Sequence, residues 1–217
     1  RWVYGLGHDV QAYLIEIFSG MPYAEYVRQT IFEPLEMRDT VFGVPPELKA
    51  RFATVYQRGE DGKLTPDTAD GYARFTEHQF ATLSLSSSMA DYLRFAQMLL
   101  NGGELDGVRI LGRKTVELKS QNHLPPNIPS ISANRPAATG YGLGVSVVLD
   151  TAALGRPGSP GNFGWSGAAT TIFSVNPEED MIVVIMAQLM PNDTALMNRI
   201  ETLVYQALVD QDSKTAE

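Results

Sequence analysis

The chain has 217 residues, 44% of them hydrophobic, which is enough to bury a substantial core in one globular domain. Its net charge of −8 and its lack of Lys/Arg runs argue against nucleic acid or an anionic membrane surface as a partner. The chain contains no cysteine, which excludes disulfides, thiolate metal sites and a cysteine nucleophile. No stretch approaches about 18 consecutive apolar residues, so no membrane span is expected. Cytoplasmic and periplasmic locations both stay open.

The first part of the chain is predicted to be helical. Apolar side chains at helical spacing predict a helix over Asp9–Ser19, which Gly20 ends. A second helix is predicted from Pro22 to about Ile31, because proline is favoured in a first helical turn. Pro34 then prevents regular helix and predicts a tight turn.

The middle of the chain combines a hairpin, loops and two more helices. Residues 52–65 are predicted to form a β-hairpin around Asp61-Gly62, and residues 80–88 a loop. Ser88 is expected to cap a helix that Gly102-Gly103 ends, with Asp91 in the position of a capping-box acid. Residues 113–120 form another short predicted helix. Residues 121–139, with four prolines and no apolar period, are predicted to be a mobile loop.

Strands dominate the last third of the chain. Three strands are predicted, over Gly140–Leu149, Trp165–Val175 and Met181–Gln188. A Gly/Pro-rich loop separates the first two, and an Asn-Pro turn separates the last two. A closing helix is predicted over Thr194–Val209. The order of the predicted elements, with helices first, then consecutive strands and then a helix, indicates an α+β fold. In this fold an antiparallel meander has helices packed on it. The expected division is one domain over 1–217, helical to about 139, with the sheet and terminal helix over about 140–210.

The start of the second strand carries a run of small residues. The sequence Gly164-Trp165-Ser166-Gly167-Ala168-Ala169 gives that strand an edge which another backbone or an extended ligand can approach closely. Taken alone, the same residues are better explained by a tryptophan that packs at a strand end with two small neighbours. Their place ahead of a strand, a turn, a second strand and a terminal helix favours a functional reading.

Taken together, these features resemble the serine hydrolases of the β-lactamase and penicillin-binding-protein superfamily, most closely the carboxylesterases related to class C β-lactamases. The resemblance covers residues 2 to about 209 and depends on the order and spacing of the motifs. It implies a β-lactamase/transpeptidase-like fold, in which strands from near the N-terminus complete the sheet. Those strands are expected to be missing from this chain.

The resemblance also implies roles for particular residues. Tyr4 would help to move the proton of the nucleophilic serine, and the backbone N–H of Ala168 would donate to the oxyanion. Trp165, Ser166 and Gly167 would line the substrate site in place of the superfamily's Lys-Thr-Gly. From its own sequence context, Tyr4 is better explained as a packing aromatic, because a free phenol has a pKa near 10 and needs adjacent positive charge to act as a base at neutral pH.

The nucleophile of this chemistry is not found in the sequence. None of the thirteen serines is followed three residues later by lysine, so the superfamily's Ser-x-x-Lys motif is absent. The resemblance therefore implies that the serine lies on an upstream segment. Partners expected on this reading are a small ester substrate and either an N-terminal fragment carrying Ser-x-x-Lys or a second copy that associates through the exposed sheet edge.

Two departures from the superfamily favour esters over lactams. Leu6 stands where the lactamases have the asparagine of Tyr-x-Asn, and Trp165 stands where they have lysine. The leading hypothesis is a serine hydrolase that cleaves carboxylic esters through an acyl-enzyme. The alternatives are a β-lactamase or D-amino-acid peptidase, an acyltransferase of the same fold, and a non-catalytic binding module.

Other candidate residues have structural explanations. Ser86, Ser87 and Ser88 lack a Gly-x-Ser-x-Gly elbow and are explained by a loop and a helix cap. The three histidines, His8, His78 and His123, are scattered and lack metal-ligand spacing. No metal site is therefore expected. No cofactor is expected either, because no helix is predicted after the glycines of residues 140–144, as a dinucleotide site would require.

Overall fold

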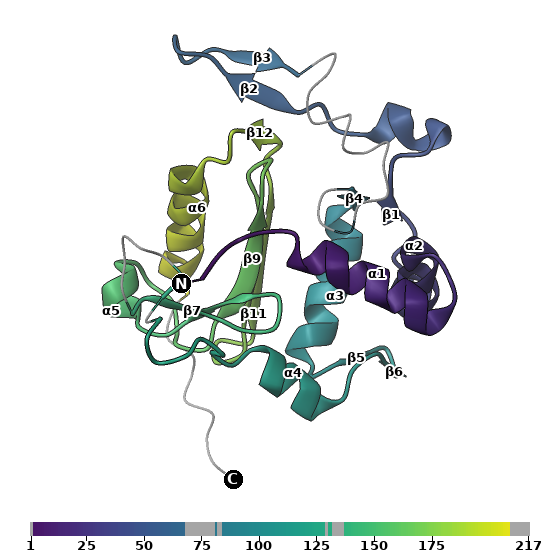
Figure 1. Ribbon diagram of the computed structural model, residues 1–217. Helices are drawn as coiled ribbons and strands as arrows, with labels where there is room; N and C mark the ends of the chain where they lie inside the picture. The colour runs from purple at the N-terminus through teal and green to yellow at the C-terminus, as the bar shows by residue number, and fades with distance from the viewer. Residues whose placement is uncertain (1, 68–80, 82–83, 129, 132–136, 209–217) are drawn as a thin grey trace.

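A five-stranded antiparallel sheet lies at the centre of the computed structural model, which describes residues 2–67, 81, 84–128, 130–131 and 137–208 (Figure 1). Each strand pairs with its neighbour in sequence, in the order β11-β10-β9-β8-β7. The strands are β7 (Thr139–Tyr141), β8 (Ser146–Val148), β9 (Phe163–Gly167), β10 (Thr171–Asn176) and β11 (Met181–Met186). The predicted α+β meander is confirmed.

Two of the predicted strands contain turns that the sequence reading missed. The strand predicted over 140–149 is the β7–β8 hairpin, in which the N–H of Gly142 donates to the carbonyl of Val145 at 2.8 Å. A Cβ on Gly142 would lie 2.1 Å from the carbonyl oxygen of Lys119, so only glycine fits there. The strand predicted over 165–175 turns at Thr170, whose φ is +57°. These turns convert three expected strands into five.

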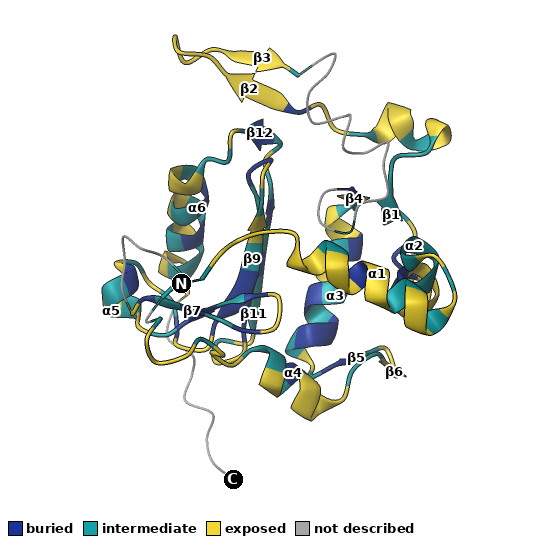
Figure 2. Cartoon of the chain, in the orientation of Figure 1, coloured by how far each residue is buried: buried dark blue, intermediate teal, exposed yellow. Residues whose placement is uncertain are grey.

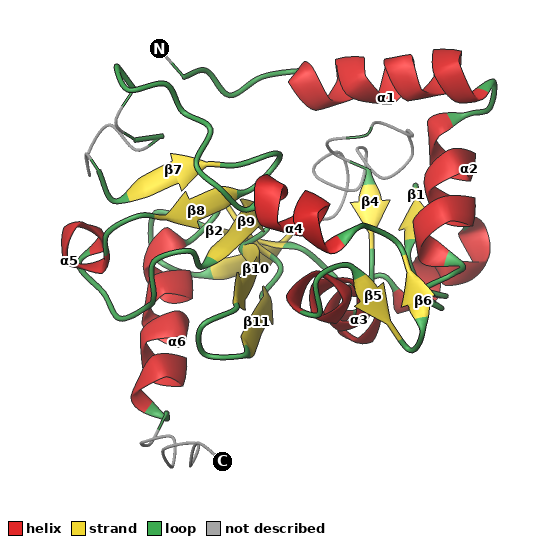
Figure 3. Ribbon diagram, turned by 90° about the horizontal axis from the view of Figure 1, so that it is seen from below, coloured by secondary structure: helices red, strands yellow, loops and turns green. Residues whose placement is uncertain are grey.

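Helices cover both faces of the sheet, α3 (Met89–Leu100) on one side and α6 (Thr194–Gln206) on the other (Figure 3). Alternate residues of β11 divide between them. Val183 and Ile185 belong to the cluster that contains Met197 of α6, whereas Ile182 and Val184 pack against the core that contains Met98 of α3. This is the two-residue period expected of a strand buried on both faces.

Buried polar groups tie α6 to the end of the sheet. The hydroxyl of Tyr205 accepts hydrogen bonds from the side-chain amides of Asn162 (3.1 Å) and Asn176 (2.8 Å), and Asn176 is fully buried. Glu201 is 1% exposed and forms an ion pair with Arg156 at 2.8 Å. Burial raises the pKa of Glu201, while Arg156 acts in the opposite direction. These contacts fix the helix that follows the candidate site.

The N-terminus of α3 is held by two different side chains. The hydroxyl of Ser88 accepts the N–H of Asp91 at 3.2 Å, which confirms Ser88 as the helix cap. The carboxylate of Asp91, however, turns toward a distant segment. It accepts the N–H of Asp39 at 2.7 Å and the hydroxyl of Thr40 at 2.8 Å. Asp91 thus anchors the 39–40 turn on α3, a long-range role that local spacing does not reveal.

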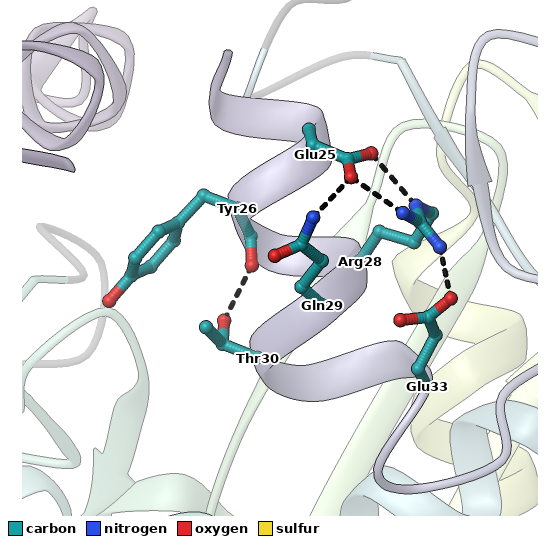
Figure 4. A network of polar contacts seen from close by, with 6 residues as sticks. All are labelled: Glu25, Tyr26, Arg28, Gln29, Thr30 and Glu33. Atoms are coloured by element: carbon teal, nitrogen blue, oxygen red, sulfur yellow. Dashed lines mark hydrogen bonds and ion pairs between the residues drawn. The ribbon is translucent and has the colours of Figure 1, made fainter. Parts of the chain in front are cut away.

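Three consecutive helical segments, α1, α2 and η1, form the start of the chain. Helix α1 (Gly7–Ser19) ends at Gly20 as predicted, and its outer surface is largely exposed (Figure 2). The second predicted helix is shorter, α2 (Tyr23–Val27), and widens into a π-helical turn, η1 (Arg28–Phe32). Figure 4 shows the side chains along it: Arg28 bridges Glu25 and Glu33, and the hydroxyl of Thr30 donates to the carbonyl of Tyr26 at 2.7 Å. The hydrogen bonds from Arg28 hold the pKa of Glu25 at about 2.

The remaining elements are short. The predicted hairpin is confirmed as β2 (Tyr56–Arg58) paired with β3 (Leu64–Pro66), and β12 (Leu189–Met190) pairs with β2. The others are β1 (Val41–Phe42) with β4 (Leu85–Ser86), the 3₁₀ turn η2 (Pro46–Arg51), β5 (Glu104–Leu105) with β6 (Val108–Arg109), α4 (Arg113–Lys119) and α5 (Thr151–Leu154). Within the predicted loops and closing helix, residues 80, 82–83, 129, 132–136 and 209 lie outside the described residues. No helix among the described residues is long and apolar enough to cross a membrane.

Replacing Asp91 with alanine should destabilise the fold. The change leaves the buried hydroxyl of Thr40 and the N–H of Asp39 without their acceptor, so the free energy of unfolding should fall by about 1–3 kcal/mol. Urea unfolding measures the change, with the exposed Glu60→Ala as a control that should stay within about 0.5 kcal/mol of the parent. Equal stability of Asp91→Ala and the parent would contradict the anchoring role.

Candidate active site

The residues 165–167 lie on β9 and form one wall of a cavity of about 470 Å³. The opposite walls come from residues 39–53, from β4 and from the start of α3. Most of the lining is apolar, including Val41, Phe52, Tyr92, Phe173 and Val184. Burial raises the pKa of Tyr92 to about 12, so this phenol stays neutral. The cavity is therefore a mostly apolar, mostly neutral space that opens beside the predicted substrate strand.

Few charged groups face this cavity. Among the described lining residues the cationic one is Arg51, which donates two hydrogen bonds to Asp39 at 2.6 and 2.7 Å. This pairing holds the pKa of Asp39 below its usual range. Ser86, Ser87 and Ser88 also line the cavity. Ser88 caps α3 and Ser87 exchanges a hydrogen bond with Thr40 at 2.7 Å, so both have the structural roles expected from the sequence.

Tyr4 and Trp165 meet in the structure although they are far apart in sequence. Their rings are stacked, with centroids 6.1 Å apart and planes inclined by 14°. Two further aromatic residues join them, Trp2 from the N-terminal segment and Tyr141 from β7. Tyr4 is 66% exposed, so its hydroxyl can be reached from solvent. The sequence reading identified Tyr4 and Trp165 but gave Tyr141 no role beyond the start of a strand.

The turn between β9 and β10 fixes the position of Ala168. On one side, the amide of Asn192 donates to the carbonyl of Gly167 at 2.7 Å. On the other, the hydroxyl of Thr170 donates to the carbonyl of Leu189 at 2.6 Å and accepts the N–H of Asp193 at 2.9 Å. Ala168 and Ser166 are exposed while Thr170 is fully buried.

Thr170 also shows backbone strain. A β-branched residue with φ near +57° is rare, and such a conformation persists only where the surroundings determine it. Here the surroundings are the 187–193 segment, which also supplies the N–H of Ala187 to the carbonyl of Thr170. Sequence reasoning missed both Thr170 and Asn192, because their roles arise from contacts across about twenty residues.

No metal centre is evident in the part of the chain that the structure describes, where no three His, Asp or Glu side chains converge as a metal would need. His8 contacts Gln11 and Tyr141, and His123 contacts the carbonyl of Leu118 at 2.8 Å. His78 lies outside the described residues.

Gly164 is required for β9 to sit against β10. A Cβ at this position would lie 2.0 Å from the carbonyl oxygen of Phe173, and backbone cannot move aside cheaply. Gly164→Ala should therefore push β9 off β10, displace Trp165 and destabilise the protein by about 1–3 kcal/mol. Chemical denaturation together with tryptophan fluorescence tests this. Gly7→Ala, with nothing within 4 Å of the new Cβ, is the matched control; identical behaviour of the two variants would contradict the close approach.

Comparison with known proteins agrees with this architecture. The family description "Beta-lactamase" matches residues 1–206. Protein Rv1367c of Mycobacterium tuberculosis is 32% identical over 200 residues, which cover 88% of this chain and 50% of that protein. Simvastatin synthase from Aspergillus terreus superposes with a TM-score of 0.83 at 24% identity, covering 97% of this chain and 57% of the other. EstCE1, a hydrolase with promiscuous acyltransferase activity, gives a TM-score of 0.76 at 20% identity, covering 93% and 55%.

The chain therefore spans about half the length of the relatives it matches. The two solved structures show a shared fold, and the family match extends over nearly all of the chain. By sequence and by fold, this chain belongs to the beta-lactamase family.

Proposed function

We propose that this chain forms the part of a serine hydrolase that positions and activates an ester substrate, while the nucleophilic serine comes from another segment. The observation that carries the proposal is the stack of Tyr4 on Trp165, beside the exposed Ser166 and Ala168, at the wall of a 470 Å³ cavity. Two observations support the proposal: Trp165, Ser166 and Gly167 line the cavity, and the candidate general base Tyr4 contacts Trp165.

The proposed reaction is acyl transfer through an acyl-enzyme. Tyr4 accepts the proton of the serine hydroxyl as its oxygen attacks the ester carbonyl, and the alcohol leaves with a proton. The N–H of Ala168 donates to the oxyanion, a contact typically worth about 2.7–4 kcal/mol in the transition state. Water then attacks the acyl-enzyme, which releases the carboxylic acid and restores the serine. An alcohol that replaces this water would make the reaction an acyltransfer.

Carboxylic esters suit the site better than β-lactams or D-amino-acid peptides. Those alternative substrates carry a carboxylate, and Trp165 offers none of the positive charge that a lysine there would supply. Arg51, the cationic residue among the described lining residues, is paired with Asp39. Leu6 likewise offers no side-chain amide to a lactam substituent. A neutral ester brings no charge that this lining would have to neutralise, so neutral esters are the substrate class that fits best.

The cavity offers a place for the segment that carries the serine. It lies between α3, the 39–53 segment and the inner face of β9–β11, and it reaches Trp165. The matched region covers 50% of Rv1367c and 57% of simvastatin synthase, so each of these proteins has a further segment of similar length. We infer that a Ser-x-x-Lys segment packs along one side of this cavity beside Trp165 and leaves the remaining space to the substrate. Its lysine would then lie near Tyr4 and supply the positive charge that a phenolic base needs.

Activity should depend on that segment. The chain by itself should neither hydrolyse p-nitrophenyl esters nor be labelled by a fluorophosphonate. A family segment carrying Ser-x-x-Lys, in frame ahead of residue 1 or as a separate chain, should restore both. In the restored enzyme, Tyr4→Phe should lower kcat by about 10²–10⁴. Tyr13→Phe, an exposed tyrosine of α1, is the control. Stoichiometric labelling of the chain by itself would place the nucleophile within these 217 residues and overturn the proposal.

Self-association is the expected behaviour of the chain without that segment. Among the strands that the structure describes, β11 is at the end of the order, and no described strand pairs with its outer edge, which could therefore pair with another chain. Sedimentation velocity should show dimers or larger species whose proportion rises with concentration. Addition of the Ser-x-x-Lys segment should reverse this. A monomer at all concentrations would argue that the edge is protected.

A further inference from the structure

The four aromatic residues at the candidate site form a closed cycle. Tyr4 stacks on Trp165, Trp165 meets Tyr141 edge-on at 5.6 Å, Tyr141 meets Trp2 edge-on at 5.5 Å, and Trp2 returns to Tyr4 at 6.1 Å. The cycle joins the N-terminal segment to two strands of the sheet, because Trp2 and Tyr4 precede α1 while Tyr141 and Trp165 belong to β7 and β9. Edge-on and offset arrangements of this kind are the favoured aromatic geometries.

The segment that carries Tyr4 has little other support. Val3 and Tyr4 are each 66% exposed, and Leu6 is 75% exposed. Apolar burial therefore contributes little to its position. The place of Tyr4 depends on the ring contacts and on whatever fixes the start of α1.

A hydrogen bond fixes the start of α1 to the cycle. The Nε2 of His8, in the first turn of the helix, lies 3.4 Å from the hydroxyl oxygen of Tyr141, and its Nδ1 lies 3.0 Å from Oε1 of Gln11. Because the Gln11 oxygen can only accept, Nδ1 carries the proton in the neutral imidazole, and Nε2 accepts from the Tyr141 hydroxyl. His8 also lies against the β7–β8 turn, since a Cβ on Gly144 would be 3.7 Å from its Cε1.

From this arrangement we propose that His8 and Tyr141 form a latch that positions Tyr4 over Trp165. Tyr141, like Tyr4, contacts both tryptophans, and His8 links Tyr141 to the helix that follows Tyr4. Neither residue touches the reacting atoms, so both are positioning residues. Their catalytic relevance rests on the proposed function, but the latch itself is a property of the fold and can be tested without activity.

The chain contains its own reporter for this test. Trp2 and Trp165 are its two tryptophans, and both belong to the cycle. Near-ultraviolet circular dichroism and tryptophan emission therefore report on this cluster. His8→Ala and Tyr141→Phe should each weaken the tryptophan dichroism and shift the emission to longer wavelength, with the far-ultraviolet spectrum unchanged. His8→Gln, which keeps an acceptor near Tyr141, should recover part of the signal.

Tyr13→Phe on the same helix is the matched control for loss of a tyrosine hydroxyl, and it should leave both signals at parent values. Unchanged tryptophan signals in both His8→Ala and Tyr141→Phe would overturn the latch. His8 is exposed, so its replacement should not prevent folding.

A second measurement separates the latch from the proposed function. In the enzyme restored with a Ser-x-x-Lys segment, His8→Ala and Tyr141→Phe should lower kcat about 10- to 100-fold with little change in KM, as expected when a catalytic group is slightly misplaced. If the spectroscopic changes occur but no activity can be restored, the latch stands and the proposed function fails. If Tyr4→Phe lowers kcat while the two latch variants do not, the positioning role fails and the proposed function stands.

Discussion

The burial of the central sheet between α3 and α6 is the constraint on which the other features depend. Alternate residues of β10 and β11 pack into two different cores, so a shift of either strand by one residue would exchange both sets of contacts. Full burial of a single large apolar side chain contributes about 1.5–3 kcal/mol, and the buried residues Phe173, Val175, Val183 and Ile185 fix the register together. With that register set, β9 must present Trp165, Ser166 and Gly167 at its end of the sheet.

The candidate site is built where this rigid sheet meets less buried segments. Gly164 lets β9 approach β10, and the strained turn at Thr170 is fixed by Asn192 and the start of α6. On the opposite side, Tyr4 is held by aromatic contacts and by the helix that begins beside it. The proposed site therefore combines a fixed backbone donor with a more weakly held phenol. This difference explains why positioning residues such as His8 and Tyr141 matter more for Tyr4 than for Ala168.

Family membership and function rest on different observations. The fold and the sequence match place the chain in the beta-lactamase family, but one fold supports many chemistries. The proposal that neutral esters are the substrates rests instead on particular residues, namely Trp165, Leu6 and the pairing of Arg51 with Asp39. These features remove the positive charge and the amide that a carboxylate-bearing substrate would use. The proposed activity can therefore be tested separately from the fold.

Local signals in the sequence were enough to predict the elements whose cause is local. Gly20 ends α1, Ser88 caps α3, Asp61-Gly62 forms the hairpin turn, and the order of elements gave the antiparallel meander. The features that the sequence did not predict depend on distant contacts. These are the turn at Gly142, where Lys119 leaves room only for glycine, and the turn at Thr170. A third is the carboxylate of Asp91, which binds a segment about fifty residues away. The sequence by itself also supplied Tyr4 and Trp165 as candidates, through resemblance. Only the tertiary structure brought their rings together and added Tyr141, His8 and Asn192, because contacts across the sheet leave no periodic pattern in the chain.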